Sequence, residues 1–282
     1  MLTSWQADRA MTLERFHLEG KVAIVTGAGR GLGRQMSLAL AHAGADVVCA
    51  ARSLDQIERT AADVRTLGRR AVAHATDVRN SAACDSLIRR AVDELGRLDI
   101  MLSNAGIGDM RSAGRELWDI EDDAWRDTLE VNLSSAFYCA RAASKVMVEQ
   151  GHGGAIINVA SGTATRAYTL DIGYGSAKAG VIAMTKTLSA MLVRHNIRVN
   201  CIIPGYVQQA PADNERSAIF AQTRGKYLPV QRLGEAWELG PLAIYLASDA
   251  SSYVTGQGFI IDGAGLAGGL APTSFAPAVP LP

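Results

Sequence analysis

The chain has 282 residues, of which 48% are hydrophobic and 20% are charged, so it is long and apolar enough to build one large domain around a sizeable core. Lysine plus arginine and aspartate plus glutamate both number 28, and the formal net charge of zero provides no basic field for nucleic acid or an anionic membrane. We therefore expect a protein that acts on a small molecule.

Residues 1–19 carry charged side chains at short intervals, so they hold no uninterrupted apolar core of a signal peptide or membrane span. We expect residues 1–17 to form an N-terminal extension and the protein to be cytoplasmic. The four cysteines lack the spacing of metal ligands and predict buried free thiols in a reducing compartment: Cys49, Cys84, Cys139 and Cys201. The five histidines lack paired ligand spacing too, so no metal site is expected.

A glycine-rich segment follows the first apolar run and opens a stretch of helical character. It comprises Thr26, Gly27, Ala28, Gly29, Arg30, Gly31, Leu32 and Gly33. Glycine permits a tight turn and lets the backbone approach a pyrophosphate, while unpaired N–H groups at the start of the helix face the anion. The segment predicts a dinucleotide-binding loop, although such a loop taken alone can also be an ordinary turn.

Short β-rich runs alternate with longer amphipathic stretches along the chain. The runs predict strands at Val22–Val25, Val47–Ala50, Ala71–Ala75, Ile100–Leu102, Ala155–Val159, Arg198–Ile203 and Phe259–Ile261. The stretches predict helices that include Leu54–Leu67, Ser81–Leu95, Asp122–Val148, Gly175–Arg194 and Glu235–Leu246. The alternation predicts a single-domain α/β fold with a Rossmann-type doubly wound parallel sheet and helices on both faces. Ligands of such sheets bind at the carboxyl ends of the strands.

The end of the second predicted strand bears on the choice of cofactor. Enzymes that bind NAD carry an acid there for the ribose 2′-hydroxyl, but this chain has Ala51 followed by Arg52. An arginine can pair with a 2′-phosphate, and Arg30 of the glycine loop could reach the same group. Asp46 lies at the opposite end of that strand. We therefore predict NADP(H) as the preferred cofactor, with NAD(H) possible; solvated loop charges are the alternative reading of both arginines.

Further motifs lie downstream of the glycine loop in a fixed order. They are Asn104-Ala105-Gly106, Asn132, Ser161, and Tyr174 with Lys178 in the pattern Tyr-x-x-x-Lys. Together these motifs resemble the short-chain dehydrogenase/reductase family over about residues 18–265. The resemblance implies transfer of a hydride between a nicotinamide and a ketone or secondary alcohol, and it implies a homotetramer.

Tyr174 and Lys178 are four residues apart on a predicted helix, so they share one face. A phenol with a pKa of about 10 is a poor base at neutral pH, but a nearby ammonium favours the phenolate, so Tyr174 can serve as general acid and base. By resemblance, Lys178 also holds the nicotinamide ribose, Ser161 polarises the substrate carbonyl, and Asn132 holds a water of a proton relay. Taken singly, each residue could instead be structural or solvent-exposed.

The resemblance also implies a set of cofactor contacts. They are Gly27, Gly29, Arg30, Gly31, Leu32, Gly33, Arg52, Ser53, Asp77, Val78, Asn104, Ala105, Gly106, Tyr174, Lys178, Pro204, Gly205 and Val207. Asp77 would accept a hydrogen bond from the adenine amino group, and Val207 would offer backbone groups to the nicotinamide carboxamide. Gln209 stands where the family usually has a threonine, which puts the usual hydroxyl contact in doubt.

The end of the chain carries the region that commonly forms a substrate lid in this family, at about residues 206–230, and an Ala/Gly/Pro-rich tail at residues 266–282. Candidate pocket residues are Gly162, Thr163, Tyr168 and Tyr206. The sequence of this region does not identify the substrate. The competing function is a noncatalytic NADP-sensing regulator on the same fold, which would need the glycine loop but no proton donor. A hydrolase is disfavoured because no Gly-x-Ser-x-Gly motif is present, and a P-loop enzyme because no Lys-Ser/Thr pair ends the loop.

Overall fold

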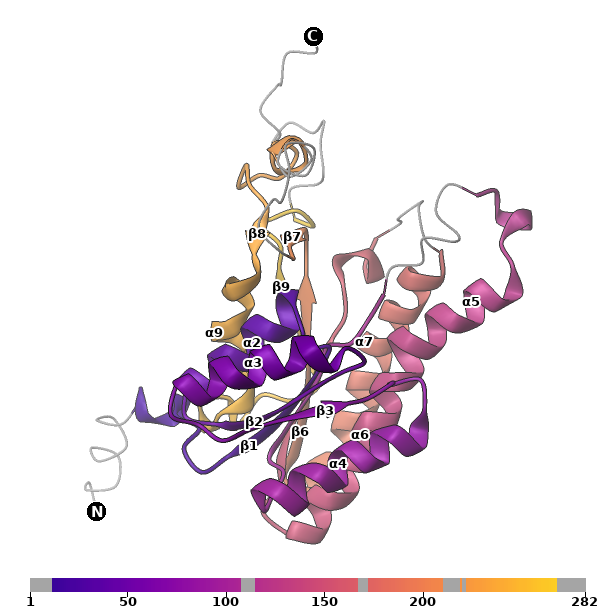
Figure 1. Cartoon of the computed structure of the whole chain (residues 1–282). Helices are drawn as coiled ribbons and strands as arrows, with labels where there is room; N and C mark the ends of the chain where they lie inside the picture. The colour runs from indigo at the N-terminus through magenta and orange to yellow at the C-terminus, as the bar shows by residue number, and fades with distance from the viewer. Residues whose placement is uncertain (1–11, 108–114, 167–171, 210–218, 220–221, 268–282) are drawn as a thin grey trace.

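Seven parallel strands form the central sheet, in the spatial order β3-β2-β1-β4-β5-β6-β9 (Figure 1). The computed structural model describes residues 12–107, 115–166, 172–209, 219 and 222–267. The strands are β1 (Val22–Thr26), β2 (Asp46–Ala51), β3 (Ala71–Ala75), β4 (Ile100–Ser103), β5 (Gly154–Val159), β6 (Ile197–Pro204) and β9 (Gly258–Ile261). Because every neighbouring pair is parallel, each connection returns through a helix, as the alternation predicts.

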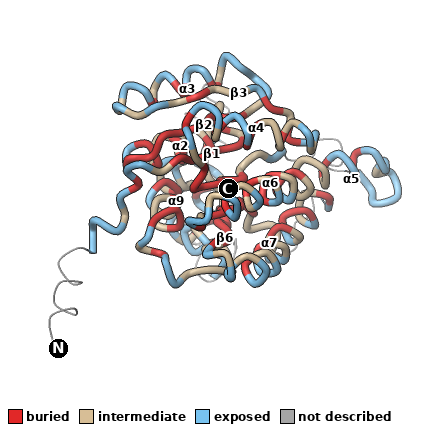
Figure 2. Tube along the Cα trace, turned by 90° about the horizontal axis from the view of Figure 1, so that it is seen from below, coloured by how far each residue is buried: buried red, intermediate tan, exposed pale blue. Residues whose placement is uncertain are grey.

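Helices cover both faces of this sheet (Figures 1 and 2). They are α2 (Gly31–His42), α3 (Leu54–Thr66), α4 (Ser81–Leu95), α5 (Asp122–Leu129), α6 (Ser135–Gln150), α7 (Ile172–Leu192) and α9 (Gly240–Ala247). Successive strand residues point to opposite faces, so Ala23 and Val25 pack with α2, α3 and α9, whereas Val22 and Ile24 pack with α4 and α6. The prediction of a doubly wound, single-domain α/β fold is confirmed.

The direction in which the chain adds strands reverses beside β1. Strand β1 pairs with β2 on one side and with β4 on the other. The chain builds β2 and β3 outward from β1, then crosses to β4 and builds outward the other way. In open α/β sheets, the crevice outside the carboxyl ends of the strands at such a reversal is where ligands bind. Thr26 and Ser103 end the two strands at this point.

The predicted helix Asp122–Val148 is helical throughout, but it contains a π-helical turn that the prediction did not include. A π-helical turn, Glu130–Ser134, separates α5 from α6, and the N–H of Ser135 bonds the carbonyl of Glu130. A π turn adds one residue to a helix and often marks a functional site, but it leaves the general apolar pattern readable as one helix. Asn132 lies in this turn.

The predicted helix Glu235–Leu246 also differs from the structure. Glu235 belongs to the short strand β8 (Gly234–Glu235), which pairs in parallel with β7 (Val207–Gln208). A 3-10 helix, Ala236–Leu239, follows, and α9 begins at Gly240 with a proline in its first turn. Proline is tolerated there because its missing N–H would have no partner inside the helix.

Part of the predicted extension packs on the domain. A 3-10 helix, Glu14–Phe16, places the Phe16 ring 6.0 Å from the Tyr245 ring of α9. Residues 1–11 and 268–282, which are most of the predicted extension and tail, lie outside the described residues. All four cysteines are buried and form no disulfide with one another. Among the helices that the structure describes, none is both long and apolar enough to span a membrane.

Candidate active site

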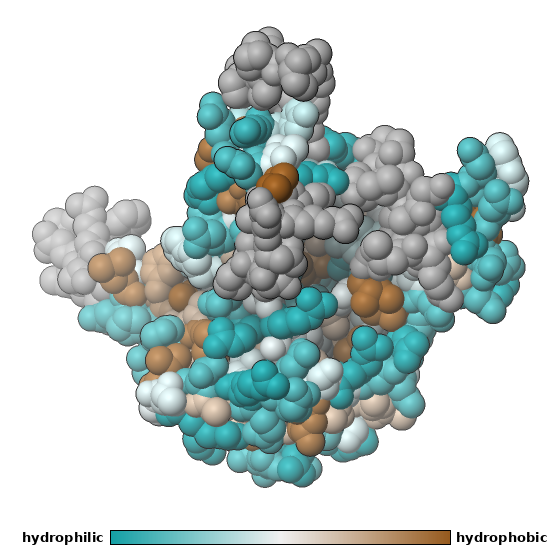
Figure 3. Space-filling model, turned by 45° about the horizontal axis from the view of Figure 1, so that its top comes forward, coloured by the Kyte–Doolittle hydropathy of each residue, from teal (hydrophilic) through white to brown (hydrophobic). Residues whose placement is uncertain are grey.

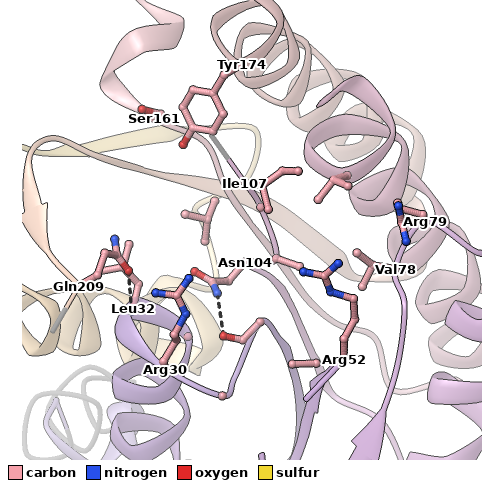
Figure 4. Close-up of a pocket in the computed structure, with 18 of the residues that line it drawn as sticks. Arg30, Leu32, Arg52, Val78, Arg79, Asn104, Ile107, Ser161, Tyr174 and Gln209 are labelled. Carbon is pink, nitrogen blue, oxygen red and sulfur yellow. Dashed lines mark hydrogen bonds between the residues drawn. The ribbon is translucent and has the colours of Figure 1, made fainter. Parts of the chain in front are cut away.

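A cleft of about 960 Å³ opens at the carboxyl edge of the sheet (Figure 4). The glycine loop, the ends of β2 to β6 and the start of α7 all contribute to its walls. The predicted site residues line this cleft with three exceptions, which are Gly31, Asn132 and Val207. Sequence analysis missed several lining residues: Gln56, Thr76, Arg79, Ile107, Asp127, Thr128, Val131 and, as a cleft residue, Gln209.

Two glycines of the loop are packed so closely that neither could carry a side chain. Gly27 has a φ of +67°, and a Cβ on it would lie 2.8 Å from Nδ2 of Asn104. A Cβ on Gly33 would collide with the carbonyl oxygen of Gly27. Glycine is therefore the residue that fits at both positions, as the close approach of a loop backbone to a dinucleotide phosphate requires.

Asn104 holds the end of β4 against the glycine loop. Its Nδ2 donates to the carbonyl of Thr26 at 3.0 Å, and its backbone N–H donates to Thr26 Oγ1 at 3.1 Å. The N–H of Ala105 donates to the same Thr26 oxygen at 3.1 Å. The Asn104-Ala105-Gly106 segment thus braces the two strand ends that flank the reversal point, and it also lines the cleft.

Two arginines face the cleft at the end of β2 and in the glycine loop. The guanidinium groups of Arg30 and Arg52 both point into the cleft in Figure 4. Neither forms a hydrogen bond or ion pair with another side chain in the described part of the protein. Asp46 begins β2 at its opposite end and is held there by Arg69 and Arg70, as its position in the sequence predicts.

Asp77 is engaged by a residue that sequence analysis missed. Arg79 donates to its carboxylate from the backbone N–H at 3.1 Å, from Nε at 3.1 Å and from Nη2 at 2.6 Å. These hydrogen bonds lower the pKa of Asp77 below its ordinary value. The Asp-x-Arg spacing was the available signal, because it lets an arginine fold back on a carboxylate two residues away. The adenine contact expected of Asp77 stays a prediction.

Ser161 and Tyr174 lie side by side at the other end of the cleft, away from Arg52 and Arg79 (Figure 4). Ser161 follows β5, and its Oγ accepts hydrogen bonds from the backbone N–H and the hydroxyl of Thr163, at 3.3 and 3.1 Å. Since both bonds are accepted, the Ser161 hydroxyl keeps its own proton to donate. Gly162, Thr163 and Tyr206 do not line this cleft, and Tyr168 lies outside the described residues.

Lys178 lies one helical turn after Tyr174 on α7. Its Nζ is 5.6 Å from the centre of the Tyr174 ring and donates to the carbonyl of Val159 at 2.9 Å. The side chain is only 3% exposed, and burial lowers its pKa to about 8. At neutral pH the ammonium is therefore still mostly protonated and close enough to act on the phenol.

Asn132 lies behind the cleft wall. Its Oδ1 accepts from the N–H of Ile107 at 3.1 Å, while its Nδ2 donates to the carbonyls of Ile107 and Thr128 at 2.8 and 3.0 Å. A Cβ on Gly106 would lie 2.7 Å from Asn132 Oδ1 and 3.3 Å from Lys178 Nζ, so both side chains face this glycine. The side chain of Asn132 thus fixes the segment after Gly106. Its part in a proton relay stays a prediction.

Gly31 and Val207 are separated from the cleft for different reasons. Gly31 has a φ of +55°, and the side chain of Gln209 covers the space beside its Cα. Val207 pairs with Gly234 in the two-stranded β7–β8 sheet. Of the predicted lid, residues 210–218, 220 and 221 lie outside the described residues. Within the described chain, no group of three or more His, Cys, Asp or Glu side chains is placed to hold a metal ion.

The sequence is similar to those of known dehydrogenases and reductases. The family model described as Enoyl-(Acyl carrier protein) reductase matches residues 27–266. The chain is 38% identical over 263 residues to 2-dehydro-3-deoxy-D-gluconate 5-dehydrogenase of Escherichia coli K12, covering 91% of this chain and 100% of that relative.

Solved structures of dehydrogenases superpose closely on the fold. A short-chain type dehydrogenase/reductase from Mycobacterium marinum has a TM-score of 0.82 at 34% identity, with 90% of this chain and 98% of that one covered. Carveol dehydrogenase from Mycobacterium avium in complex with NAD has a TM-score of 0.82 at 31% identity, with coverages of 89% and 99%. The chain therefore belongs to the short-chain dehydrogenase/reductase family and is an oxidoreductase of CH–OH and C=O groups.

Proposed function

We propose that the protein is an NADP(H)-dependent reductase of ketones, or dehydrogenase of secondary alcohols, in which Tyr174 is the general acid and base. One observation carries this proposal: a single cleft has Ser161, Tyr174 and Lys178 at one end and, toward the other, the guanidinium groups of Arg30 and Arg52, which point into it. The glycine loop, which opens helix α2 at the wall of this cleft, fits a pyrophosphate.

Three side chains at the Ser161–Tyr174 end of the cleft have different roles in the proposed reaction. The nicotinamide, when bound, supplies or accepts the hydride. Ser161 donates its hydroxyl proton to the substrate oxygen and polarises the carbonyl. Tyr174 gives its proton to that oxygen during reduction and removes it during oxidation. The buried ammonium of Lys178 favours the phenolate form of Tyr174 and would donate to the ribose hydroxyls.

The preference for NADP(H) is argued from charge. The end of β2 carries no carboxylate, since Ala51 is followed by Arg52, and the carboxylate at the end of β3, Asp77, is already paired with Arg79. A 2′-phosphate in this region would meet Arg30 and Arg52, while the Asp77 carboxylate, which acts on Arg52 only through space, is hydrogen-bonded to Arg79. The glycine loop is compatible with NAD(H) as well. The carveol dehydrogenase, which has a similar fold, was solved in complex with NAD.

The proposed function is tested by steady-state kinetics with NADPH, NADP⁺, NADH and NAD⁺ against a panel of ketones and secondary alcohols. The panel includes 2-dehydro-3-deoxy-D-gluconate, the substrate named for the Escherichia coli relative. We expect the highest kcat/KM with the NADP(H) pair. A higher kcat/KM with NAD(H) would refute the cofactor assignment. Cofactor binding without turnover of any compound would instead favour the sensor.

We also propose a cytoplasmic homotetramer. Apolar side chains of α6 and α7 face solvent, namely Phe137, Val148, Ile172 and Met191, and they could be covered by a second copy. Hydrophilic residues otherwise cover most of the described surface seen in Figure 3, with smaller hydrophobic patches between them. Light scattering coupled to size-exclusion chromatography should give four times the chain mass of 29.8 kDa. A monomer at micromolar concentration would contradict the proposal.

A further inference from the structure

Gln209 reaches across the cleft to the start of α2. The residue directly follows β7, and its side chain points toward the glycine loop in Figure 4. Oε1 of Gln209 accepts a hydrogen bond from the backbone N–H of Leu32 at 3.4 Å. The same oxygen covers the space beside the Cα of Gly31, which lacks a side chain that would displace it.

The N–H group that Gln209 covers is one that the helix itself cannot satisfy. Helix α2 begins at Gly31, so the N–H of Leu32 has no carbonyl partner inside the helix. Arg30, which precedes the helix, provides no capping bond from its side chain. Gln209 therefore caps α2 from 177 residues away in the sequence. The N-terminal N–H groups of a helix are also the groups that bind phosphate.

We propose that the Gln209 amide occupies the anion-binding position of α2 and competes with the dinucleotide pyrophosphate, so that Gln209 sets the affinity for the cofactor. This inference rests on the proposed function. A phosphate oxygen carries more negative charge than an amide oxygen, so it forms the stronger hydrogen bond with the Leu32 N–H. The hydrogen bond between this N–H and Gln209 must break before the phosphate can bind. A neutral hydrogen bond of this kind weakens cofactor binding about three- to tenfold.

A second role for the same side chain makes the opposite prediction. If the Gln209 amide instead donated to the bound cofactor, its removal would weaken binding. The sign of the change in affinity therefore separates a competitor from a ligand. Gln208 provides a matched control, because it has the same side chain one position earlier, pairs with Glu235 through the β7–β8 backbone and does not line the cleft.

The experiment measures the Kd of NADPH by fluorescence titration for wild type, Q209A, Q209E and Q208A, and the melting temperature of each protein without cofactor. We expect Q209A to bind NADPH about three- to tenfold more tightly, because the competing bond is gone. Q209E should bind at least about tenfold more weakly, because its carboxylate holds the helix terminus and repels phosphate. Q208A should stay within about twofold of wild type, as expected for a residue outside the cleft.

The melting temperatures provide a readout that does not depend on the cofactor. Q209A should melt at a lower temperature than wild type because α2 loses its cap, and Q209E should not, because a carboxylate caps the helix. If Q209A bound NADPH as tightly as wild type or more weakly, the competing role of Gln209 would be overturned, whereas the proposed function would stand. A wild-type protein that bound neither NADPH nor NADH would overturn the proposed function, and with it this inference.

Discussion

Lys178→Met should stabilise the cofactor-free protein although it removes the activity. Lys178 is 3% exposed, no carboxylate of the described chain pairs with it, and burial lowers its pKa from 10.5 to about 8. This shift means that the charged side chain costs the folded state about 3 kcal/mol at neutral pH. Methionine has a similar length, and the lost hydrogen bond to Val159 costs about 1–2 kcal/mol. The net gain should be about 1–2 kcal/mol.

The pH dependence gives this prediction its sharpest form. Between about pH 8 and pH 10.5 the unfolded chain keeps the Lys178 proton, whereas the folded protein has lost it. The unfolded state then binds more protons, so the wild-type free energy of unfolding rises with pH relative to the variant. The advantage of Lys178→Met should be largest below pH 8 and should shrink through this window. The Cys201 thiol, whose pKa burial raises from 9.0 to about 11, lowers the stability of both proteins as pH rises above 9, and both proteins carry it.

Urea denaturation of both proteins at several pH values from 7 to 10, at one protein concentration, measures the difference directly. Subtracting the two curves removes the titration of groups that both proteins share. Lys186→Met is the control, because Lys186 is an exposed lysine of the same helix, and it should change stability by less than about 0.5 kcal/mol. A Lys178→Met protein that is less stable than wild type at pH 7, or a difference that does not change with pH, would refute the reasoning.

Three further substitutions test the two ends of the cleft. Arg52→Asp should shift the ratio of kcat/KM values from NADP(H) toward NAD(H) by about 30-fold to 150-fold, because it removes a charged partner of the 2′-phosphate worth roughly 2–3 kcal/mol; an unchanged ratio would contradict this. Tyr174→Phe should abolish kcat and leave the Kd of NADPH within about twofold, since the ring still packs and only the proton donor is lost; substantial residual turnover would exclude Tyr174 as the acid. Thr163→Val should lower kcat about threefold to tenfold with little effect on the Kd of NADPH, because Ser161 loses a hydrogen bond that orients it; wild-type kcat would show that Ser161 needs no such support.

The sequence was sufficient to predict the strands and the glycine loop, because their patterns lie within short stretches of the chain. Every predicted strand is present within one or two residues, because strands buried on both faces are continuous apolar runs flanked by turn residues. The glycine loop was equally readable, since a positive φ at Gly27 and the crowding around Gly33 leave glycine as the residue that fits. The alternation of strands and helices predicted a doubly wound parallel sheet, whereas the order of the strands in that sheet comes from the structure.

The details that were missed depend on contacts between distant segments. The π turn at Asn132 is held by hydrogen bonds to Ile107, 25 residues earlier, and nothing in the apolar pattern of residues 122–148 records them. The same holds for the cap that Gln209 provides to α2. The sequence places Gln209 in a family motif, but only the fold brings its side chain to Leu32.

These departures from local rules lie at one edge of the sheet. A buried lysine costs stability, a π turn disturbs a helix, and a helix terminus is capped by a side chain from a distant segment of the chain. All three features adjoin the cleft. The opposite edge follows ordinary rules, with Asp46 and Asp99 paired to neighbouring arginines. Since the same core supports both edges, folding alone does not explain the difference. Two of these features are the ones that the proposed function uses: a cation beside a phenol, and backbone N–H groups at the start of α2.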